Sequence, residues 1–393
     1  MQFTLTSQSV QRLTRDLLRT HLALADYGRC CSVAALVAVL GAACARLTSL
    51  WAAARSLHRG PGPETVRKAL RANLPVDAAR LERRWHQALQ AVLPAALRKR
   101  RHRVAVDLTL IPYHGRPQHS AAELYRGQAK SGTTHFHAYA TLYLLQRSQR
   151  FTVALTWVHQ GADAAAVLRQ LLRAAAQAGI RPRLVLLDRG FYTVAVLRYL
   201  QAARYPFVLP VPFKGRRASH PQGPGGTRVF AAWPRSGWGS YTLHSTGQPH
   251  ATVGVCVHCR NRAGRRNRHG REPLVYAYWG WQPASPAAVS RLYRRRFGIE
   301  SSYRQMNQAR PRTCSRDPLV RLFLVGVALL LRNVWVWLHW QVVAGQRRGA
   351  RRLRPRALPF KQLLLMLLHV AEAQFAVADD VATERPLPTV LEN

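Results

Sequence analysis

Residues 103 to 213 contain an alternation of strand and helix patterns that limits the folds open to this chain. Three segments rich in Val, Thr, Tyr and Phe predict strands at 104–113, 134–145 and 151–160. An amphipathic helix ending at Gly179 follows, then an apolar strand ending at Asp188, a second helix and a further strand. The order β-β-β-α-β-α-β predicts an α/β domain with a mixed sheet flanked by helices.

The 393 residues are enough for several such units. Short basic helices joined by Gly and Pro turns predict a helical DNA-binding domain of the helix-turn-helix kind at 1–100, with a helical cap on the main domain as an equal alternative. We expect the α/β core in two parts, at 101–213 and 289–345, with a β-rich insertion at 214–288. Residues 346–393 predict a basic linker, a short helix and a flexible tail.

The charge balance indicates a polyanionic partner. The chain carries 59 lysines and arginines against 17 aspartates and glutamates, a formal net charge of +42. A GC-rich genome explains arginine in place of lysine, but it does not explain the shortage of acids. Nucleic acid is the expected counter-charge, and a ribosomal or membrane-surface protein is the remaining alternative.

The six cysteines do not form the framework of a secreted disulfide-rich protein. Cys256 and Cys259 make a CxxC pair with His258 and His269 nearby, but the flanking residues alternate as in a strand. Buried thiols are therefore expected, with a structural zinc site as the alternative.

The segment 319–345 is long and apolar, yet Arg321, Arg332 and Asn333 interrupt it, which favours a buried core helix over a membrane span. Residues 1–11 are polar and lack the apolar core of a signal peptide. These two patterns predict a cytoplasmic protein.

Acidic residues are rare between Arg101 and Gly345, where only seven occur, and three of them lie where chemistry would need them. Asp107 falls within a predicted strand, Asp188 ends another, and Glu300 lies in a helical stretch at 285–308. Each has an ordinary alternative: an ion pair with arginine for Asp107, capping of the next helix for Asp188, and a solvated pair with Arg296 for Glu300.

Together the three carboxylates suit two Mg²⁺ or Mn²⁺ ions, because these metals prefer oxygen ligands. Two such ions clamp the attacking and leaving oxygens of an in-line phosphoryl transfer. The strand that ends at Asp188 supports this interpretation, since ligands of open α/β sheets bind beyond the carboxyl ends of the strands.

The segments around these carboxylates resemble insertion-sequence transposases of the DDE class, whose catalytic domain has the RNase H-like fold. The resemblance rests on VAVDLTLIPYHG, LLDRGFY and YRRRFGIESSYRQMNQARPRT, and it covers about 101–345. Tyr293, Arg296 and Glu300 keep the spacing of the family's Tyr-Arg-Glu-Lys signature. Its lysine position falls on Asn307, where Arg304 or Arg310 is the candidate substitute.

The resemblance implies that Asp107, Asp188 and Glu300 are catalytic and bind the metals. It implies cleavage of transposon ends and joining of the 3′-hydroxyl to target DNA, by a homodimer on the DNA of a prokaryotic nucleoid. Candidate DNA contacts are Tyr293, Arg296, Arg304 and Trp238, the last by stacking a displaced base, for which Trp233 is the alternative. A metal-dependent nuclease of the same fold and a catalytically inactive DNA-binding relative remain the rival functions.

Overall fold

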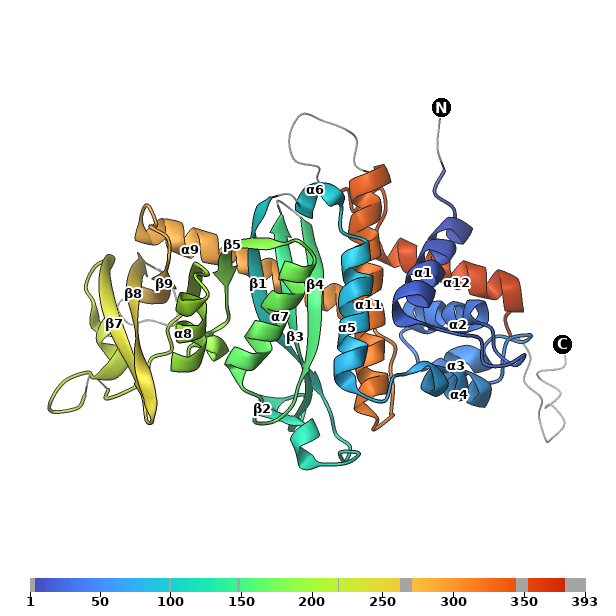
Figure 1. Ribbon diagram of the computed structural model, residues 1–393, viewed down its shortest axis with the longest axis horizontal. Coiled ribbons are helices and arrows are strands. Elements are labelled where there is room, and N and C mark those ends of the chain that lie inside the picture. Colours follow the sequence, from blue (N-terminus) through green and yellow to red (C-terminus); the bar gives the residue numbers. More distant parts are fainter. Residues whose placement is uncertain are drawn as a thin grey trace, which may run out of the picture.

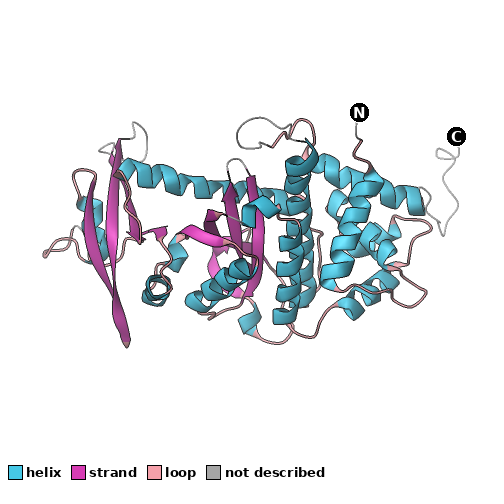
Figure 2. Ribbon diagram, turned by 45° about the horizontal axis from the view of Figure 1, so that its top comes forward, coloured by secondary structure: helices cyan, strands magenta, loops and turns pink. Residues whose placement is uncertain are grey.

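The computed structural model of the protein describes residues 4–98, 100–146, 149–217, 219–261, 271–343 and 353–378. A bundle of helices lies at one end of an elongated molecule, a sheet with helices on both faces lies in the middle, and a long antiparallel hairpin lies at the other end (Figure 1). Figure 2 shows the same division into a helical end and a strand-rich end. Two predicted segments fall outside the described residues. They are the tail beyond residue 378 and residues 346–352, which make up most of the basic linker.

The helices predicted for the N-terminal region are present. They are α1 (Ser7–Leu22), α2 (Val33–Arg46), α3 (Leu50–Arg55), α4 (Pro63–Asn73), α5 (Ala78–Ala91) and α6 (Ala95–Arg98). Side chains of Thr6, Ser32, Ser49 and Asp77 cap four of them by accepting backbone N–H groups. The C-terminal helix α12 (Phe360–Phe375) packs against α1 and α2, so it belongs to the same bundle.

The described strands form one mixed sheet, as predicted, in the order β2-β3-β1-β5-β6-β9-β8-β7, with β4 beside β3. The strands are β1 (Arg101–Pro112), β2 (Tyr125–Lys130), β3 (Thr133–Gln146), β4 (Gln149–Val158), β5 (Arg181–Leu186), β6 (Phe207–Pro210), β7 (Gly237–Ser245), β8 (Gln248–Asn261) and β9 (Arg271–Trp279). The β1–β5 and β5–β6 pairs are parallel, and the other pairs are antiparallel.

Two features of the sheet differ from the sequence patterns. The short strand β2 was not predicted, because its residues 125–130 are polar and mostly exposed. The three strands of the insertion continue the central sheet, since β9 pairs with β6 along Phe207–Pro210. Figure 1 shows β7 and β8 extending from the core in this way.

Helices cover both faces of the sheet. Val104 and Val106 of β1 pack in the same apolar cluster as α7 (Ala164–Gln177) and α8 (Val194–Ala202). Ala105, on the opposite face, packs in a second cluster with α9 (Pro286–Arg294) and α10 (Gly298–Asn307). Asp107 shares the face of Ala105, because alternate residues of a strand point the same way.

The prediction of one continuous helix over residues 285–308 is wrong at residues 295–297. A 3-10 turn (Arg295–Phe297) separates α9 from α10. The break coincides with Gly298, whose backbone lies against the Arg150 guanidinium, so that a Cβ at this position would lie 1.8 Å from the Arg150 Cζ. Glycine also has a low helix propensity, which adds to the tendency to break here.

Polar side chains from two helices cover the outer edge of β4. β4 pairs with β3 on one side, and α5 and α11 (Pro318–Leu338) pack against it. The contacts, all to β4 backbone, are Glu82 to Trp157 N, His86 to Leu155 O, Gln90 to Val153 O, and Asn333 to both Thr152 N and Thr152 O. These side chains replace the missing neighbouring strand and keep the edge from pairing with another chain.

The long apolar helix is a core helix, as predicted. Pro318–Val343, which includes α11 and a π-helical turn (His339–Val343), is the one described helix with the length and composition to cross a membrane, and 94% of its apolar window is buried. Figure 1 shows α11 beside α5, between the sheet and the helical bundle.

Gly326→Ala should lower the free energy of unfolding by about 3 kcal/mol, the upper part of the usual range for overpacking a core. A Cβ at this position of α11 would lie 2.0 Å from Trp85 of α5, which is fully buried. Gly62→Ala is the matched control, because its Cβ meets only the Thr65 hydroxyl at 3.9 Å. Equal urea midpoints for both variants would contradict this account of the α5–α11 contact.

Candidate active site

Asp107 lies in the middle of β1, opposite Thr141 of β3, and only 8% of its surface is exposed. One carboxylate oxygen accepts a hydrogen bond from its neighbour's backbone, Leu108 N, at 3.0 Å. The Tyr303 hydroxyl donates to the Asp107 carbonyl oxygen at 3.1 Å and lies 2.7 Å from the Thr141 hydroxyl. The tyrosine thus ties α10 to the strand that carries the carboxylate.

Asp188 follows β5 at the edge where the parallel strands end. It precedes a 3-10 turn (Arg189–Phe191) and its side chain caps no helix. Thr193 caps α8 instead, accepting from Val196 N at 3.3 Å, so the capping alternative for Asp188 is wrong. The Asp188 side chain is 41% exposed, which leaves it open to a ligand from solvent.

Arg296 joins the two aspartates. Its Nη1 lies 3.0 Å from Asp107 Oδ1 and its Nη2 lies 2.9 Å from Asp188 Oδ1. The 3-10 turn between α9 and α10 delivers this side chain, which is 9% exposed, to the sheet. The ion pair foreseen as the alternative for Asp107 is therefore present, and its partner also holds Asp188.

Burial sets the protonation of this cluster. Burial raises the pKa of Asp107 to about 6; the Arg296 charge opposes the rise, and the Asp188 charge adds to it. Burial alone would lower the pKa of Arg296, but the negative charges of Asp107 and Asp188 and the interaction with Tyr293 raise it overall. The guanidinium is therefore fully charged, and it compensates for two carboxylates that would otherwise repel each other.

Tyr293, at the end of α9, also supports the Asp188 end of β5. Its hydroxyl donates to the Leu187 carbonyl oxygen at 3.0 Å, and its ring lies 5.4 Å from the Arg296 guanidinium carbon. The side chain is 3% exposed, and burial raises its pKa. Sequence spacing paired Tyr293 with Arg296, and the structure confirms that the two are neighbours.

Glu300 lies in the first turn of α10 with its side chain exposed. It forms no ion pair with Arg296, whose guanidinium is held by the two aspartates. Among the described residues, no three His, Cys, Asp or Glu side chains lie close enough to hold one metal ion. The structure brings Asp107 and Asp188 together and leaves Glu300 apart.

The other four acidic residues of the core have structural contacts, as their sequence positions suggested. Asp163 caps α7, Asp317 caps α11, Glu123 accepts from Gln118 N and His119 N, and Glu272 pairs with Arg260. None of these four joins a second carboxylate on one cation, whereas the aspartates at 107 and 188 share Arg296.

The remaining candidate DNA contacts differ in exposure. Arg304 and Asn307 are exposed on α10, whereas Arg310 is partly buried, and burial lowers its pKa. Trp238 of β7 is 41% exposed and packs edge-on against Tyr278, with ring centroids 5.5 Å apart. Trp233 is half-buried against Phe230.

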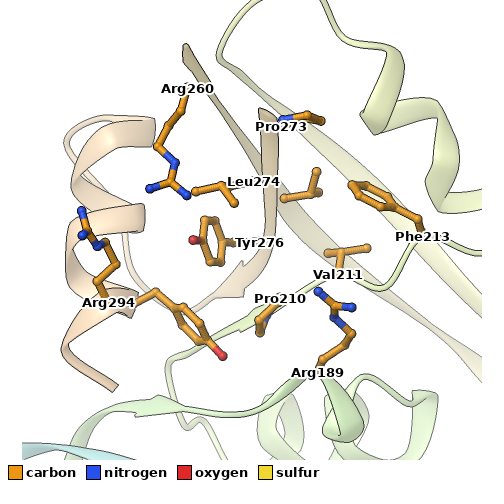
Figure 3. A pocket seen from close by; sticks show the side chains of 11 residues that line it. Arg189, Pro210, Val211, Phe213, Arg260, Pro273, Leu274, Tyr276 and Arg294 are labelled. Carbon is orange, nitrogen blue, oxygen red and sulfur yellow. The ribbon is translucent and has the colours of Figure 1, made fainter. Parts of the chain in front are cut away.

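A cavity of about 580 Å³ opens beside Asp188 (Figure 3). Its walls come from β6 and the residues after it, from β9 and from α9. The lining residues include Arg189, Arg260, Arg294, Phe213, Tyr276 and Tyr293. Figure 3 shows the arginines around an apolar and aromatic centre. Sequence reasoning missed this cavity; its one local signal is Arg189, directly after Asp188.

The CxxC pair resembles a pair of buried thiols more than a metal site. Cys256 is fully buried, and burial raises its pKa to about 12, while Cys259 is partly exposed. All six cysteines are free, and His269 lies outside the described residues.

The chain matches the family model of the transposase DDE domain over residues 98–333. Among solved structures, it is similar to a piggyBac transposase synaptic complex with hairpin DNA, with a TM-score of 0.55 and 9% identity, over 93% of this chain and 80% of that chain. This likeness and the mixed sheet confirm the predicted RNase H-like fold. The catalytic domain of human endonuclease V also matches, with a TM-score of 0.24 and 15% identity over 62% of this chain and 92% of that chain, too low to support a comparison. No curated protein sequence matches the chain significantly.

Proposed function

Because this chain belongs to the transposase DDE domain family and is a DNA transposase of the DDE type, we propose that Asp107, Asp188 and Glu300 are its catalytic carboxylates. The observation that carries the proposal is the convergence of Asp107 and Asp188 on one guanidinium, at 3.0 and 2.9 Å. One carboxylate from within β1 and one from the turn after β5 reach a single cation here, as a metal-dependent site requires.

DDE transposases use divalent metal ions, and we propose two Mg²⁺ or Mn²⁺ ions for this one. Asp107 and Asp188 fit as oxygen ligands, because their carboxylates already share one cation and no helix cap occupies Asp188. When bound, the ions activate the attacking hydroxyl and stabilise the leaving oxygen.

The protein side chains then have separate tasks in our proposal. Asp107 is held rigidly by the β1 backbone and Tyr303, whereas Asp188 is open to the substrate side. Arg296 neutralises both carboxylates in this structure, and with metal ions on the carboxylates it would be free to pair with a phosphate of the DNA. Tyr293 lines the wall of the cavity, and its hydroxyl keeps the end of β5 in place; because its side chain is buried, it supports the site in our proposal and does not contact the DNA directly.

Glu300 joins the aspartates in this proposal through a movement of α10. The turn at Arg295–Phe297 supports this idea, because the helix is already interrupted between Arg296 and Glu300. The exposed Glu300 side chain has no ion pair to break among the residues that the structure describes. A reordered turn would shift the start of α10 together with Ile299, the fully buried residue directly before Glu300.

We propose that the enzyme cuts the ends of an insertion sequence with water and joins the 3′-hydroxyl to target DNA, working as a homodimer in the cytoplasm on nucleoid DNA of a prokaryote. The net charge of +42 supports binding to both DNA partners. Residues 1–100 form the helical DNA-binding domain in this scheme. The core in two parts (101–213 and 289–345) carries the chemistry. The insertion at 214–288 supplies Trp238, which is exposed and can stack on a displaced base. Arg304 of α10 contacts the DNA backbone.

Glu300→Gln should lower metal-dependent end cleavage by about 100-fold or more, because a neutral amide is a poor ligand for a hard cation. The melting temperature should not change, since the side chain is exposed. Glu64→Gln, in the first turn of α4 with a side chain that is 47% exposed and paired with Arg67, is the control for the same chemical change. Undiminished cleavage by the Glu300 variant would remove this residue from the site.

Supplying the enzyme with pre-cut ends separates a transposase from a nuclease of the same fold. A transposase joins these ends to a target duplex, whereas a nuclease leaves them unjoined. Absence of joined product, with cleavage intact, would contradict the strand-transfer step.

A further inference from the structure

A second cavity lies at the end of the sheet opposite to Asp188. It has a volume of about 830 Å³ and lies where β1, β5 and β6 begin. Its lining residues come from three connections: the one from α6 to β1, the one from α7 to β5 and the one from α8 to β6. Six are arginines: Arg98, Arg100, Arg101, Arg181, Arg183 and Arg204. We call this set the arginine pocket.

The charges of the arginine pocket are not balanced by acids. All six side chains are exposed, and none forms an ion pair within the part of the chain that the structure describes. Arg98 donates to the Gln90 carbonyl oxygen at 2.8 Å and so has a structural use as well. A second copy of this chain is a poor partner, because it offers only 17 acids against 59 basic residues.

Positive charge continues from the arginine pocket toward the aspartates. Arg103 lies two residues after Arg101 on β1, on the face that carries Asp107. Burial lowers the pKa of Arg103, and the charges of Arg295 and Arg183 lower it further. Arg295 directly precedes the arginine that holds both aspartates.

The distance between the arginine pocket and the two aspartates allows one DNA duplex to contact both. Six residues of extended strand separate Arg101 from Asp107, a distance of about 20 Å. Successive phosphates along one strand of B-DNA advance by about 3.4 Å, so this span corresponds to about six base pairs. The lining is cationic with a single aromatic ring, Tyr205, which suits phosphates better than bases.

We propose that the arginine pocket binds the phosphate backbone of the duplex about six base pairs from the scissile phosphate, independently of base sequence. The inference rests on the proposed DNA-cutting function of Asp107 and Asp188. The same backbone chemistry is offered by the transposon end and by the target duplex, and the experiment separates these two sources.

The test removes three charges from the arginine pocket in the full-length protein, with Arg101→Ser, Arg181→Ser and Arg204→Ser combined. Binding is measured without divalent metal, so that the result does not depend on catalysis. The slope of log K against log salt should decrease in magnitude by about 2 to 3, since each phosphate contact contributes about 0.9. The probes are a duplex with the terminal sequence of the element and an unrelated duplex.

A second triple variant, Arg169→Ser, Arg173→Ser and Arg235→Ser, has the same net charge and changes exposed arginines that do not line the pocket. A smaller slope for the pocket variant alone supports the proposal. A change with the terminal duplex alone assigns the pocket to donor DNA, a change with the unrelated duplex alone assigns it to target DNA, and a change with both shows that it binds either duplex. Equal slopes for both variants overturn it, whether or not the aspartates prove catalytic. Circular dichroism and melting curves confirm that both variants are folded.

Discussion

Asp188→Ala should reduce metal-dependent cleavage of transposon ends by about three orders of magnitude or more, while binding to the ends persists. Asp188 is the more exposed of the two aspartates on Arg296, so it is the carboxylate that an incoming metal ion and phosphate meet first. A thousandfold loss corresponds to about 4 kcal/mol of transition-state stabilisation, within the several kcal/mol that a catalytic metal supplies. Gel-based cleavage and binding assays on the same duplex measure both effects.

Two further variants separate the loss of a metal ligand from unfolding of the protein. Asp188→Asn keeps the shape of the side chain and should be nearly as inactive as the alanine variant. Asp163→Asn makes the same chemical change at the cap of α7, where asparagine caps about as well as aspartate, and should cleave normally. Cleavage by Asp188→Asn at the level of Asp163→Asn would exclude Asp188 as a catalytic ligand.

Asn333→Ala should lower the free energy of unfolding by about 3 kcal/mol or more, because buried groups without partners cost about 1 to 3 kcal/mol each. Asn333 is fully buried in α11, accepts from Thr152 N at 2.9 Å and donates to Thr152 O and Leu89 O at 2.7 and 3.2 Å. Without the Asn333 side chain, the buried backbone N–H and C=O of Thr152, on the outer edge of β4, lose the hydrogen bonds that Asn333 provides. Urea unfolding measures the change as a lower midpoint with an unchanged slope.

Asn307→Ala is the matched control for this stability effect, since Asn307 ends α10 with its side chain exposed. Its unfolding midpoint should stay within about 0.5 kcal/mol of the parent, as is usual for surface changes. If Asn333→Ala were equally harmless, the polar contacts at the edge of β4 would not contribute to stability.

The two aspartates could be predicted from local sequence. A carboxylate within an apolar strand is costly unless it is paired, and the carboxyl ends of parallel strands meet at one edge of a sheet. Both arguments need only the residues around Asp107 and Asp188. The caps at Asp163 and Asp317 were equally accessible, because a cap interacts with the next few residues.

The bridging role of Arg296 could not be predicted in this way. Helical spacing placed Arg296 and Glu300 on one face, but the turn at Arg295–Phe297 breaks the helix between them. The contact of Arg296 with Asp188 spans 108 residues of sequence, and that of Tyr303 with Asp107 spans 196. Such contacts depend on how whole elements pack, which no local pattern records.

The continuity of the sheet through the insertion was hidden for a related reason. Strand patterns predicted β7, β8 and β9, but which strands pair is decided by distant partners such as Phe207 and Trp279, whose rings stack 6.4 Å apart. The cavity beside Asp188 follows from that pairing, because β6 and β9 supply two of its walls.

The packing of α12 on α1 and α2 has a consequence for synthesis on the ribosome. Leu363, Leu364 and Leu367 of α12 are fully buried, and Leu367 lies directly against Gly41 of α2. Helices α1 and α2 therefore wait for residues 360–375 before their core is complete, although domains generally fold in the order in which they are made. A transposase of this design finishes this bundle only after α12 has been translated.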